Sequence, residues 1–119
     1  MIRYGGANKY HSHKTERGGI TFDSRREADR WQELILLQRA GKIAGLNRQV
    51  KFELIPAQAR QFKGDTAERA TYYIADFTYI EDGQLIVEDV KSKATRTPEY
   101  RIKRKLMRWV HGIRIREVE

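Results

Sequence analysis

The sequence contains no cysteine, no long apolar run and no apolar leader. Without cysteine the chain can form neither a disulfide framework nor a cysteine-ligated zinc site. A membrane-spanning helix needs roughly 20 consecutive apolar residues, and no stretch approaches that length. The N-terminus, Met1 to Lys14, is polar and lacks the apolar region of a signal peptide. We therefore expect a soluble intracellular protein that does not use a membrane as its partner.

Acidic residues are outnumbered: 16 Asp and Glu stand against 24 Lys and Arg, and the net charge is +8. A balance this basic favours an anionic partner such as nucleic acid or an anionic membrane surface. The membrane is the weaker of the two, because the basic helix lacks the large apolar face of an interfacial anchor. The chain has 119 residues, of which 39% are apolar, and this suffices for one domain with one core.

The first part of the chain divides into an arm and a helix. Residues 1–19 are polar, basic and glycine-containing, and we interpret them as an arm that is ordered partly or only on contact. Residues 20–22 are expected to be a short extended piece. Ser24 and Glu27 have capping-box spacing, and the apolar stripe behind them predicts a helix over residues 24–40.

Three strands are predicted next. Residues 50–55 alternate between apolar and polar, and Pro56 ends this half-buried strand. Residues 57–68 are polar and are expected to form a loop. Residues 70–80 and 84–91 form the next two strands, and the glycine between them suits a tight turn.

A second helix and a last strand complete the domain. Pro98 suits a first helical turn, and Gly112 is expected to end this helix. Its predicted apolar face consists of Ile102, Leu106, Trp109 and Val110. Residues 113–116 alternate as a final strand. The order α-β-β-β-α-β defines an α/β fold, with a single domain over residues 20–119.

Two of the predicted strands carry acids, and the second also carries a lysine. Asp89 and Lys91 leave their strand on the same face because side chains alternate along a strand. If the strands pair as a hairpin, Asp76 meets them near one end of the sheet. Two carboxylates beside a lysine suit a hard divalent cation that activates water against a phosphodiester.

Mg²⁺ prefers oxygen ligands, so Asp76, Asp89 and the carbonyl of Val90 are its candidate ligands. Lys91 would hold or deprotonate the attacking water, or neutralise a phosphate oxygen, and these roles differ in the protonation of the lysine. An Asp-x-Lys sequence can also be a solvated pair. Asp76, however, lies inside an apolar run, where a strand seldom places a charge. Glu88 points to the opposite face and would pair with an arginine.

Glu27 has two interpretations. It is either the reciprocal residue of the capping box or a first-helix carboxylate that reaches the metal or its water. These roles compete for one side chain.

Eight cationic side chains against one carboxylate, Glu99, occupy residues 91–108. A solvated helix face is the ordinary explanation of such a run, but the charge is so one-sided that we predict contact with a phosphate backbone. Lys103, on the flank of the helix, can point back toward the site. The candidate nucleic-acid-binding residues are Lys93, Arg96, Arg101, Lys103, Arg104, Lys105 and Arg108.

The combination of Asp76, Asp89-x-Lys91, a preceding-helix Glu27 and a following basic helix resembles the PD-(D/E)XK nuclease superfamily. More narrowly, the chain resembles a small phage-encoded family of unknown function assigned to that superfamily. Ala75 stands where the motif has proline. The matching segments cover nearly the whole chain: Asn8–Tyr10, Ile20–Ala28, Tyr73–Phe77, Val87–Lys91 and Tyr100–Lys105.

The resemblance implies a restriction-endonuclease-like αβββαβ core, with a mixed central sheet flanked by helices. It also implies Mg²⁺-dependent phosphodiester hydrolysis, with Asp76 and Asp89 as metal ligands, Lys91 at the water and Glu27 as the first-helix acid. Mn²⁺ is expected to substitute, and no organic cofactor is expected.

The predicted function is therefore that of an endodeoxyribonuclease acting on DNA. By analogy within the superfamily, its substrate is branched or junction DNA in phage recombination or packaging, in the cytoplasm of a bacterial host. A homodimer would most easily cut two strands. The alternative is a non-catalytic nucleic-acid-binding protein that uses the same basic helix.

Overall fold

The computed structural model describes residues 14–119. The first described element is a small antiparallel sheet of β1 (Thr15–Arg17) and β2 (Ile20–Phe22). The boundary predicted between residues 19 and 20 therefore falls inside a hairpin, because backbone pairing orders the end of the predicted arm. Residues 1–13 of that arm lie outside the described residues.

Helix α2 (Arg25–Arg39) matches the helix predicted over residues 24–40. Ser24 is its N-cap, and the Ser24 hydroxyl accepts the backbone N–H of Glu27 at 3.1 Å. Such a cap satisfies one of the otherwise unpaired N–H groups of the first turn. After the helix, Gly41 has a φ of +77°, which turns the chain toward the sheet.

The main sheet has four strands in the order β3-β4-β5-β6. β3 (Ala44–Ile55), β4 (Thr71–Glu81) and β5 (Gln84–Val90) form an antiparallel meander, and β6 (Arg116–Val118) pairs parallel to β5. This mixed sheet with helices confirms the predicted α/β fold and its αβββαβ order. β3 begins earlier than predicted, and β6 begins later, because ladder pairing sets strand limits more strongly than side-chain alternation.

Helix α3 (Pro98–Leu106) continues into a π-helical turn, η1 (Met107–His111), which Gly112 ends. The predicted apolar face of this segment is only partly confirmed: Leu106 packs against the core, but Ile102 is 58% exposed and Trp109 is 85% exposed. Tyr100 and Met107 are buried instead. In a π turn the backbone hydrogen bonds join residues five apart instead of four apart. Side chains beyond Met107, including that of Trp109, therefore leave the face that α-helical spacing predicts.

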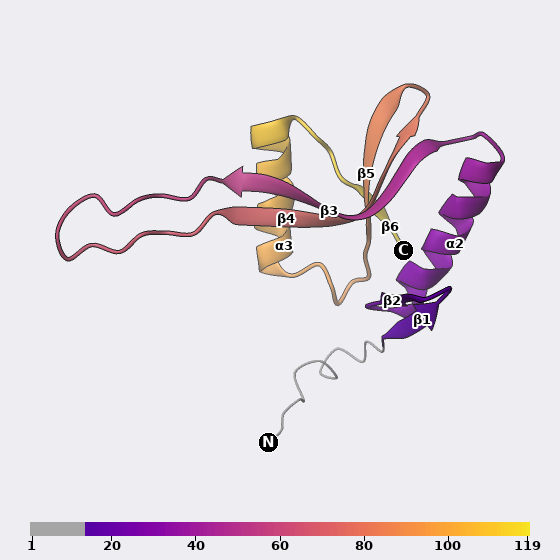
Figure 1. Ribbon diagram of the computed structural model, residues 1–119, viewed down its shortest axis with the longest axis horizontal. Coiled ribbons are helices and arrows are strands. Elements are labelled where there is room, and N and C mark those ends of the chain that lie inside the picture. Colours follow the sequence, from indigo (N-terminus) through magenta and orange to yellow (C-terminus); the bar gives the residue numbers. More distant parts are fainter. Residues whose placement is uncertain (1–13) are drawn as a thin grey trace, which may run out of the picture.

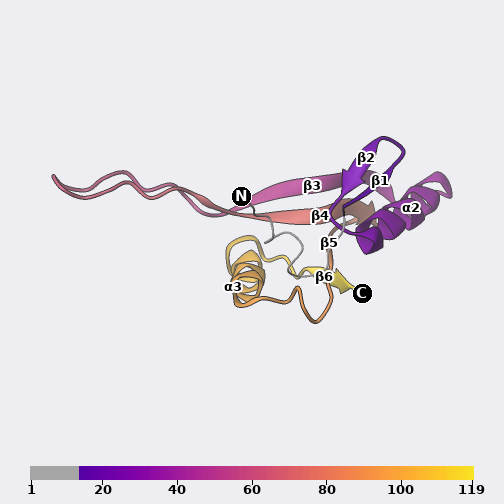
Figure 2. The same cartoon turned by 90° about the horizontal axis from the view of Figure 1, so that it is seen from below.

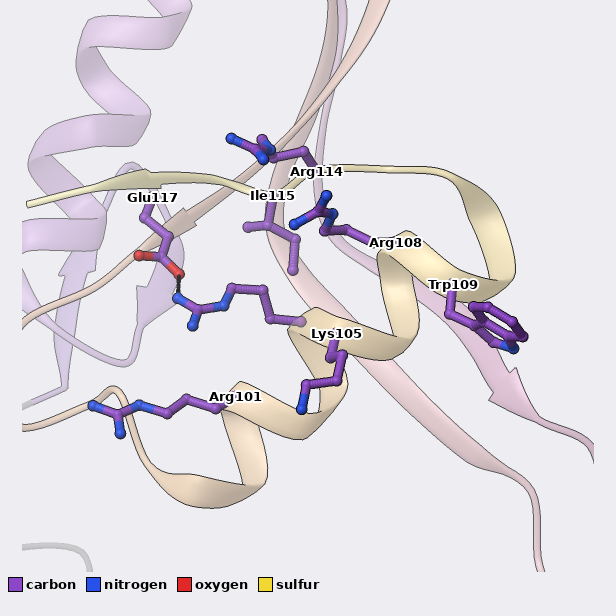
Figure 3. Close-up of a pocket in the computed structure, with 8 residues that line it drawn as sticks. Arg101, Lys105, Arg108, Trp109, Arg114, Ile115 and Glu117 are labelled. Atoms are coloured by element: carbon purple, nitrogen blue, oxygen red, sulfur yellow. Dashed lines mark hydrogen bonds and ion pairs between the residues drawn. The ribbon is translucent and has the colours of Figure 1, made fainter.

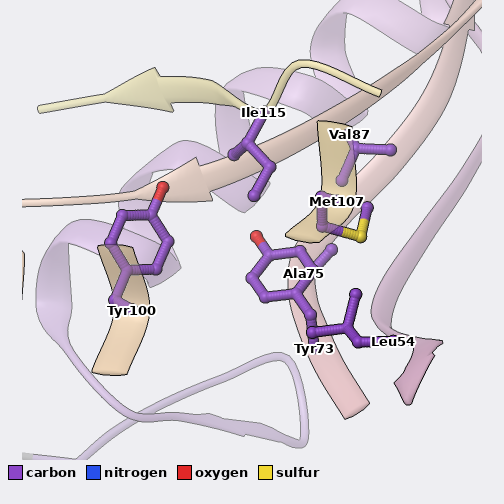
Figure 4. Close-up of a cluster of buried hydrophobic side chains, with 7 residues drawn as sticks. All are labelled: Leu54, Tyr73, Ala75, Val87, Tyr100, Met107 and Ile115. Carbon is purple, nitrogen blue, oxygen red and sulfur yellow. The ribbon is translucent and has the colours of Figure 1, made fainter. Parts of the chain in front are cut away.

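Buried side chains of the described chain form two clusters. One lies between α3 and the sheet and includes Tyr73 and Ala75 of β4 (Figure 4). The other lies between α2 and the sheet and includes Phe77 and Tyr79 of β4. The intervening residue of β4 is Asp76, so the fold places this carboxylate at the boundary between the two cores.

Between β3 and β4 the chain runs out as a long projection, which both views show extending away from the helices (Figures 1 and 2). Its two sides are joined at the isolated bridge between Gln58 and Glu68. This region corresponds to the predicted loop over residues 57–68. In the described part of the chain, no helix has both the length and the apolar character needed to cross a membrane.

Candidate active site

Asp76, Asp89 and Lys91 converge where β4 and β5 separate. The ladder between these strands ends at the pair Phe77 and Glu88, so Asp76 and Asp89 occupy the next positions. A carboxylate oxygen of Asp76 accepts the backbone N–H of Val90 at 2.8 Å. Lys91 Nζ lies 3.3 Å from Asp89 Oδ1. Both acids and the lysine line one cavity of about 350 Å³.

Two tyrosines hold this group in place. The Tyr73 hydroxyl donates to Asp89 Oδ2 at 2.5 Å, and the Lys91 ammonium lies 4.1 Å from the centre of the Tyr100 ring. Burial and the charge of Asp89 raise the pKa of Tyr73 far above its ordinary value, so the hydroxyl keeps the proton that it donates. The site predicted from the sequence includes neither Tyr73 nor Tyr100. The available signal was that a buried tyrosine hydroxyl needs a polar partner.

The carboxylates of the site repel one another. Burial is the main cause that raises the pKa of Asp76 to about 9; the charge of Asp89, a hydrogen bond shared with Asp89 and the charge of Glu27 add to it. The N–H of Val90 acts in the opposite direction. A bound cation would remove this repulsion, since it is attracted to every one of the carboxylates.

Glu27 belongs to the same electrostatic neighbourhood, although it does not line the cavity. It is only 7% exposed, and burial followed by the charges of Asp23 and Asp89 raises its pKa to about 7. Its backbone N–H is bound by Ser24, whereas its carboxylate makes no hydrogen bond to residues 14–119. The reciprocal capping-box bond, from the Ser24 N–H to the Glu27 side chain, is therefore not formed in residues 14–119. The cap uses only the backbone N–H of Glu27, and the carboxylate stays available for the second predicted role.

The oxygen donors fit a magnesium ion. Asp76 and Asp89 would hold it, and the predicted third ligand, the carbonyl of Val90, belongs to the residue whose N–H Asp76 already binds. Among residues 14–119, no group of three or more acidic or histidine side chains is arranged to hold a metal. Two carboxylates agree with the usual coordination of Mg²⁺, which binds one or two protein carboxylates and retains several water ligands.

Glu88 lies on the opposite side of β5 from Asp89 and is fully buried. Arg30 of α2 donates to both of its oxygens, at 2.7 and 2.9 Å, and the Tyr79 hydroxyl donates at 2.6 Å. Glu88 thus has the arginine partner that strand alternation predicted, and it joins α2 to the sheet.

Four of the predicted phosphate-binding residues line a second, larger hollow. This basic groove of about 810 Å³ lies between the α3–η1 segment and the chain that follows it (Figure 3). Sequence reasoning missed two of its members, Trp109 and Arg114, because it placed Trp109 in the core and Arg114 in a strand. Its principal lining residues are Arg101, Arg104, Lys105, Arg108, Trp109 and Arg114.

The other three predicted cations lie elsewhere. Lys103 lines the cavity of Asp76 and Asp89, as its position on the helix flank predicted. Its Nζ lies 3.1 Å from Oε2 of Glu99. Arg96 pairs with Glu117 at 3.1 Å, so much of its charge is already used within the chain. Lys93 is exposed in the loop before α3.

The fold and the site define a small mixed α/β domain in which a half-buried carboxylate, Asp76, and a buried one, Asp89, lie beside a lysine. Within that class, the chain belongs to the family described as "Protein of unknown function (DUF1064)", whose model matches residues 7–117. No curated protein and no solved structure matches the chain significantly.

Proposed function

We propose that this protein is a Mg²⁺-dependent endodeoxyribonuclease of the PD-(D/E)XK type. The observation that supports this most strongly is the convergence of Asp76, Asp89 and Lys91 in one cavity at the point where β4 and β5 separate. The two acids and the lysine occupy the sequence positions of the nuclease motif, apart from Ala75 where the motif has proline, and their convergence supports the proposal.

The side chains divide the reaction between them. Asp76 and Asp89 would hold the cation, which would supply charge stabilisation at the phosphate and a more acidic water. Lys91 is positioned by Asp89 and by the ring of Tyr100, so its ammonium is directed at the water or at a phosphate oxygen. Glu27 has a pKa of about 7, which suits a group that takes up a proton at neutral pH.

Cleavage assays test the proposal directly. Plasmid, linear and four-way-junction DNA are incubated with Mg²⁺, Mn²⁺ or EDTA, and the wild type is expected to cut only with metal. Asp89→Asn and Lys91→Ala are expected to bind DNA without cutting it. Matched controls are Asp82→Asn and Lys42→Ala, which change exposed residues away from the cavity and should cut normally. A wild-type protein that binds tightly but cuts nothing with either metal would show that it is not an enzyme.

A non-catalytic nucleic-acid-binding function is the second candidate, and the basic groove favours it independently of the carboxylates. Phosphate contacts release counterions, so affinity should fall steeply with salt, with a log–log slope of about −0.9 per neutralised phosphate of a duplex. Arg101→Ala and Lys105→Ala should each flatten that slope. Binding that is insensitive to salt would exclude phosphate contact for either function.

The proposal has three further parts. The substrate is branched phage DNA, the protein acts in the cytoplasm of a bacterial host, and it acts as a homodimer. Preference for the four-way junction over linear DNA in the cleavage assay tests the first, and light scattering with and without DNA tests the last.

A further inference from the structure

Trp109 is the most exposed of the large apolar side chains in residues 14–119, at 85%. Burial of an indole ordinarily contributes strongly to stability, so leaving it in water forfeits that gain. Isolated surface apolar residues are common and need no explanation. Trp109 differs because it is one of the lining residues of the basic groove, at whose edge its ring points outward from the helix (Figure 3).

The position of Trp109 is fixed by its neighbours in the π turn. Two residues earlier, Met107 is fully buried in the core beneath α3. Two residues later, the imidazole of His111 lies 2.7 Å from the carbonyl oxygen of Glu53 and packs edge-on against Phe52. Both contacts anchor the turn to the sheet. The backbone that carries Trp109 is therefore held in place, and its indole points into the solvent. Single π turns are frequent at functional sites.

The charge of the groove is available to a ligand. Its one carboxylate, Glu117, is already engaged by Arg96, Arg104 and the Tyr100 hydroxyl, at 3.1, 2.7 and 2.6 Å. Within the described chain, the remaining four cations of the groove have no carboxylate partner: Arg101, Lys105, Arg108 and Arg114. The groove therefore combines unpaired positive charge with an exposed aromatic face.

We propose that the basic groove binds an unpaired strand of nucleic acid, with phosphates on its four free cations and a base stacked on Trp109. Stacking on a side chain requires a base with a free face, and neighbouring bases occupy both faces inside a duplex. The inference rests on the nucleic-acid part of the proposed function and specifies it: the substrate presents an unpaired segment.

The fluorescence of Trp109 reports this contact. The chain has two tryptophans, and Trp31→Phe leaves Trp109 as the only one. Trp31 stacks on Phe77 with ring centres 5.8 Å apart, so phenylalanine preserves an aromatic contact there. Titration in EDTA with oligo(dT) should quench the emission of Trp109. An abasic oligomer with the same number of phosphates should bind more weakly and leave the emission nearly unchanged.

Substitution of Trp109 gives the affinity. Trp109→Ala should weaken oligo(dT) binding roughly 5- to 150-fold, the range for loss of one stacked base. The same variant should bind the abasic oligomer as the wild type does, and Trp109→Phe should recover part of the loss. The matched control is Ile102→Ala, which removes another exposed apolar side chain of α3 outside the groove.

Each outcome decides the inference. If Trp109→Ala binds oligo(dT) like the wild type, or if abasic and base-containing oligomers bind equally, no base stacks on Trp109. The assay contains no metal and measures no cleavage, so these results leave the nuclease proposal standing. Conversely, a protein that quenches with oligo(dT) but never cuts DNA retains the groove function and loses the enzymatic one. If no oligomer binds at low salt, the groove does not hold an unpaired strand, and the cleavage assay with metal still decides the nuclease proposal on its own.

Discussion

The substitution Asp76→Asn distinguishes two possible roles of Asp76: a ligand for a cation, or only a structural hydrogen-bond acceptor. The substitution removes the charge, preserves the size of the side chain, and retains an oxygen that can accept the N–H of Val90, now bound at 2.8 Å. If Asp76 serves only as that acceptor, asparagine should change little. If its charge is held in place for a metal, the metal-free fold should be more stable without it.

The magnitude follows from the pKa of Asp76, which rises from 3.8 to about 9 on folding. Because the folded pKa is raised, the penalty is absent below about pH 4 and grows as the pH rises toward 9. Each pH unit in that window corresponds to about 1.4 kcal/mol, so the penalty at pH 7 has an upper bound of about 4 kcal/mol. Asp76→Asn should therefore stabilise the metal-free protein at pH 7 and leave its stability unchanged near pH 4.

Urea denaturation followed by circular dichroism, at several pH values between 4 and 8.5 in EDTA, measures this difference. Mg²⁺ at ten times its Kd should add about 1.4 kcal/mol to the wild type and nothing to Asp76→Asn. Asp82→Asn, in an exposed turn, is the control and should show neither effect. An Asp76→Asn variant that is equally destabilised at every pH, and a wild type that does not respond to Mg²⁺, would refute this interpretation of the site.

Two further predictions concern the ion pairs that support the site. Arg30→Ala leaves the fully buried carboxylate of Glu88 without its arginine partner. The free energy of unfolding, measured by urea denaturation, should therefore fall by about 3–5 kcal/mol. Loss of the exposed Arg25 should have little effect, and a loss below about 1 kcal/mol in Arg30→Ala would contradict the structural role of the pair. Hydrogen bonds from Tyr100, Arg104 and Arg96 lower the pKa of Glu117 to about 2, against an ordinary 4.5. This depressed pKa stabilises the fold above about pH 4.5 and ceases to do so as the pH falls through 2, so Glu117→Gln should be destabilised at pH 7 but not near pH 2, as thermal melts at both pH values would show.

Local rules predicted much of the fold. Ser24 and the spacing of the apolar side chains behind it predicted α2, because a helix start depends on residues within one turn of it. Side-chain alternation predicted that Asp89 and Lys91 share a face while Glu88 takes the other. The opposite outcome at Trp109 has an equally local cause, a π turn, but the apolar spacing alone carries no sign of it.

Residues far apart in the sequence set the remainder of the site. Tyr73 reaches Asp89 and Tyr100 underlies Lys91 only because β4, β5 and α3 meet at one end of the sheet. The burial of the Glu27 carboxylate near Asp89 likewise depends on the packing of α2 against the sheet.

The sequence by itself determined the order of the elements, the basic balance and the identity of the acids and lysine, since these follow from composition and spacing along one strand or helix. Only the tertiary structure decided that Asp76 lies between two cores at the separation of β4 and β5, and that Trp109 stands in a groove of unpaired cations. Burial and mutual charge depend on distances between elements, and those distances exist only once the chain has folded.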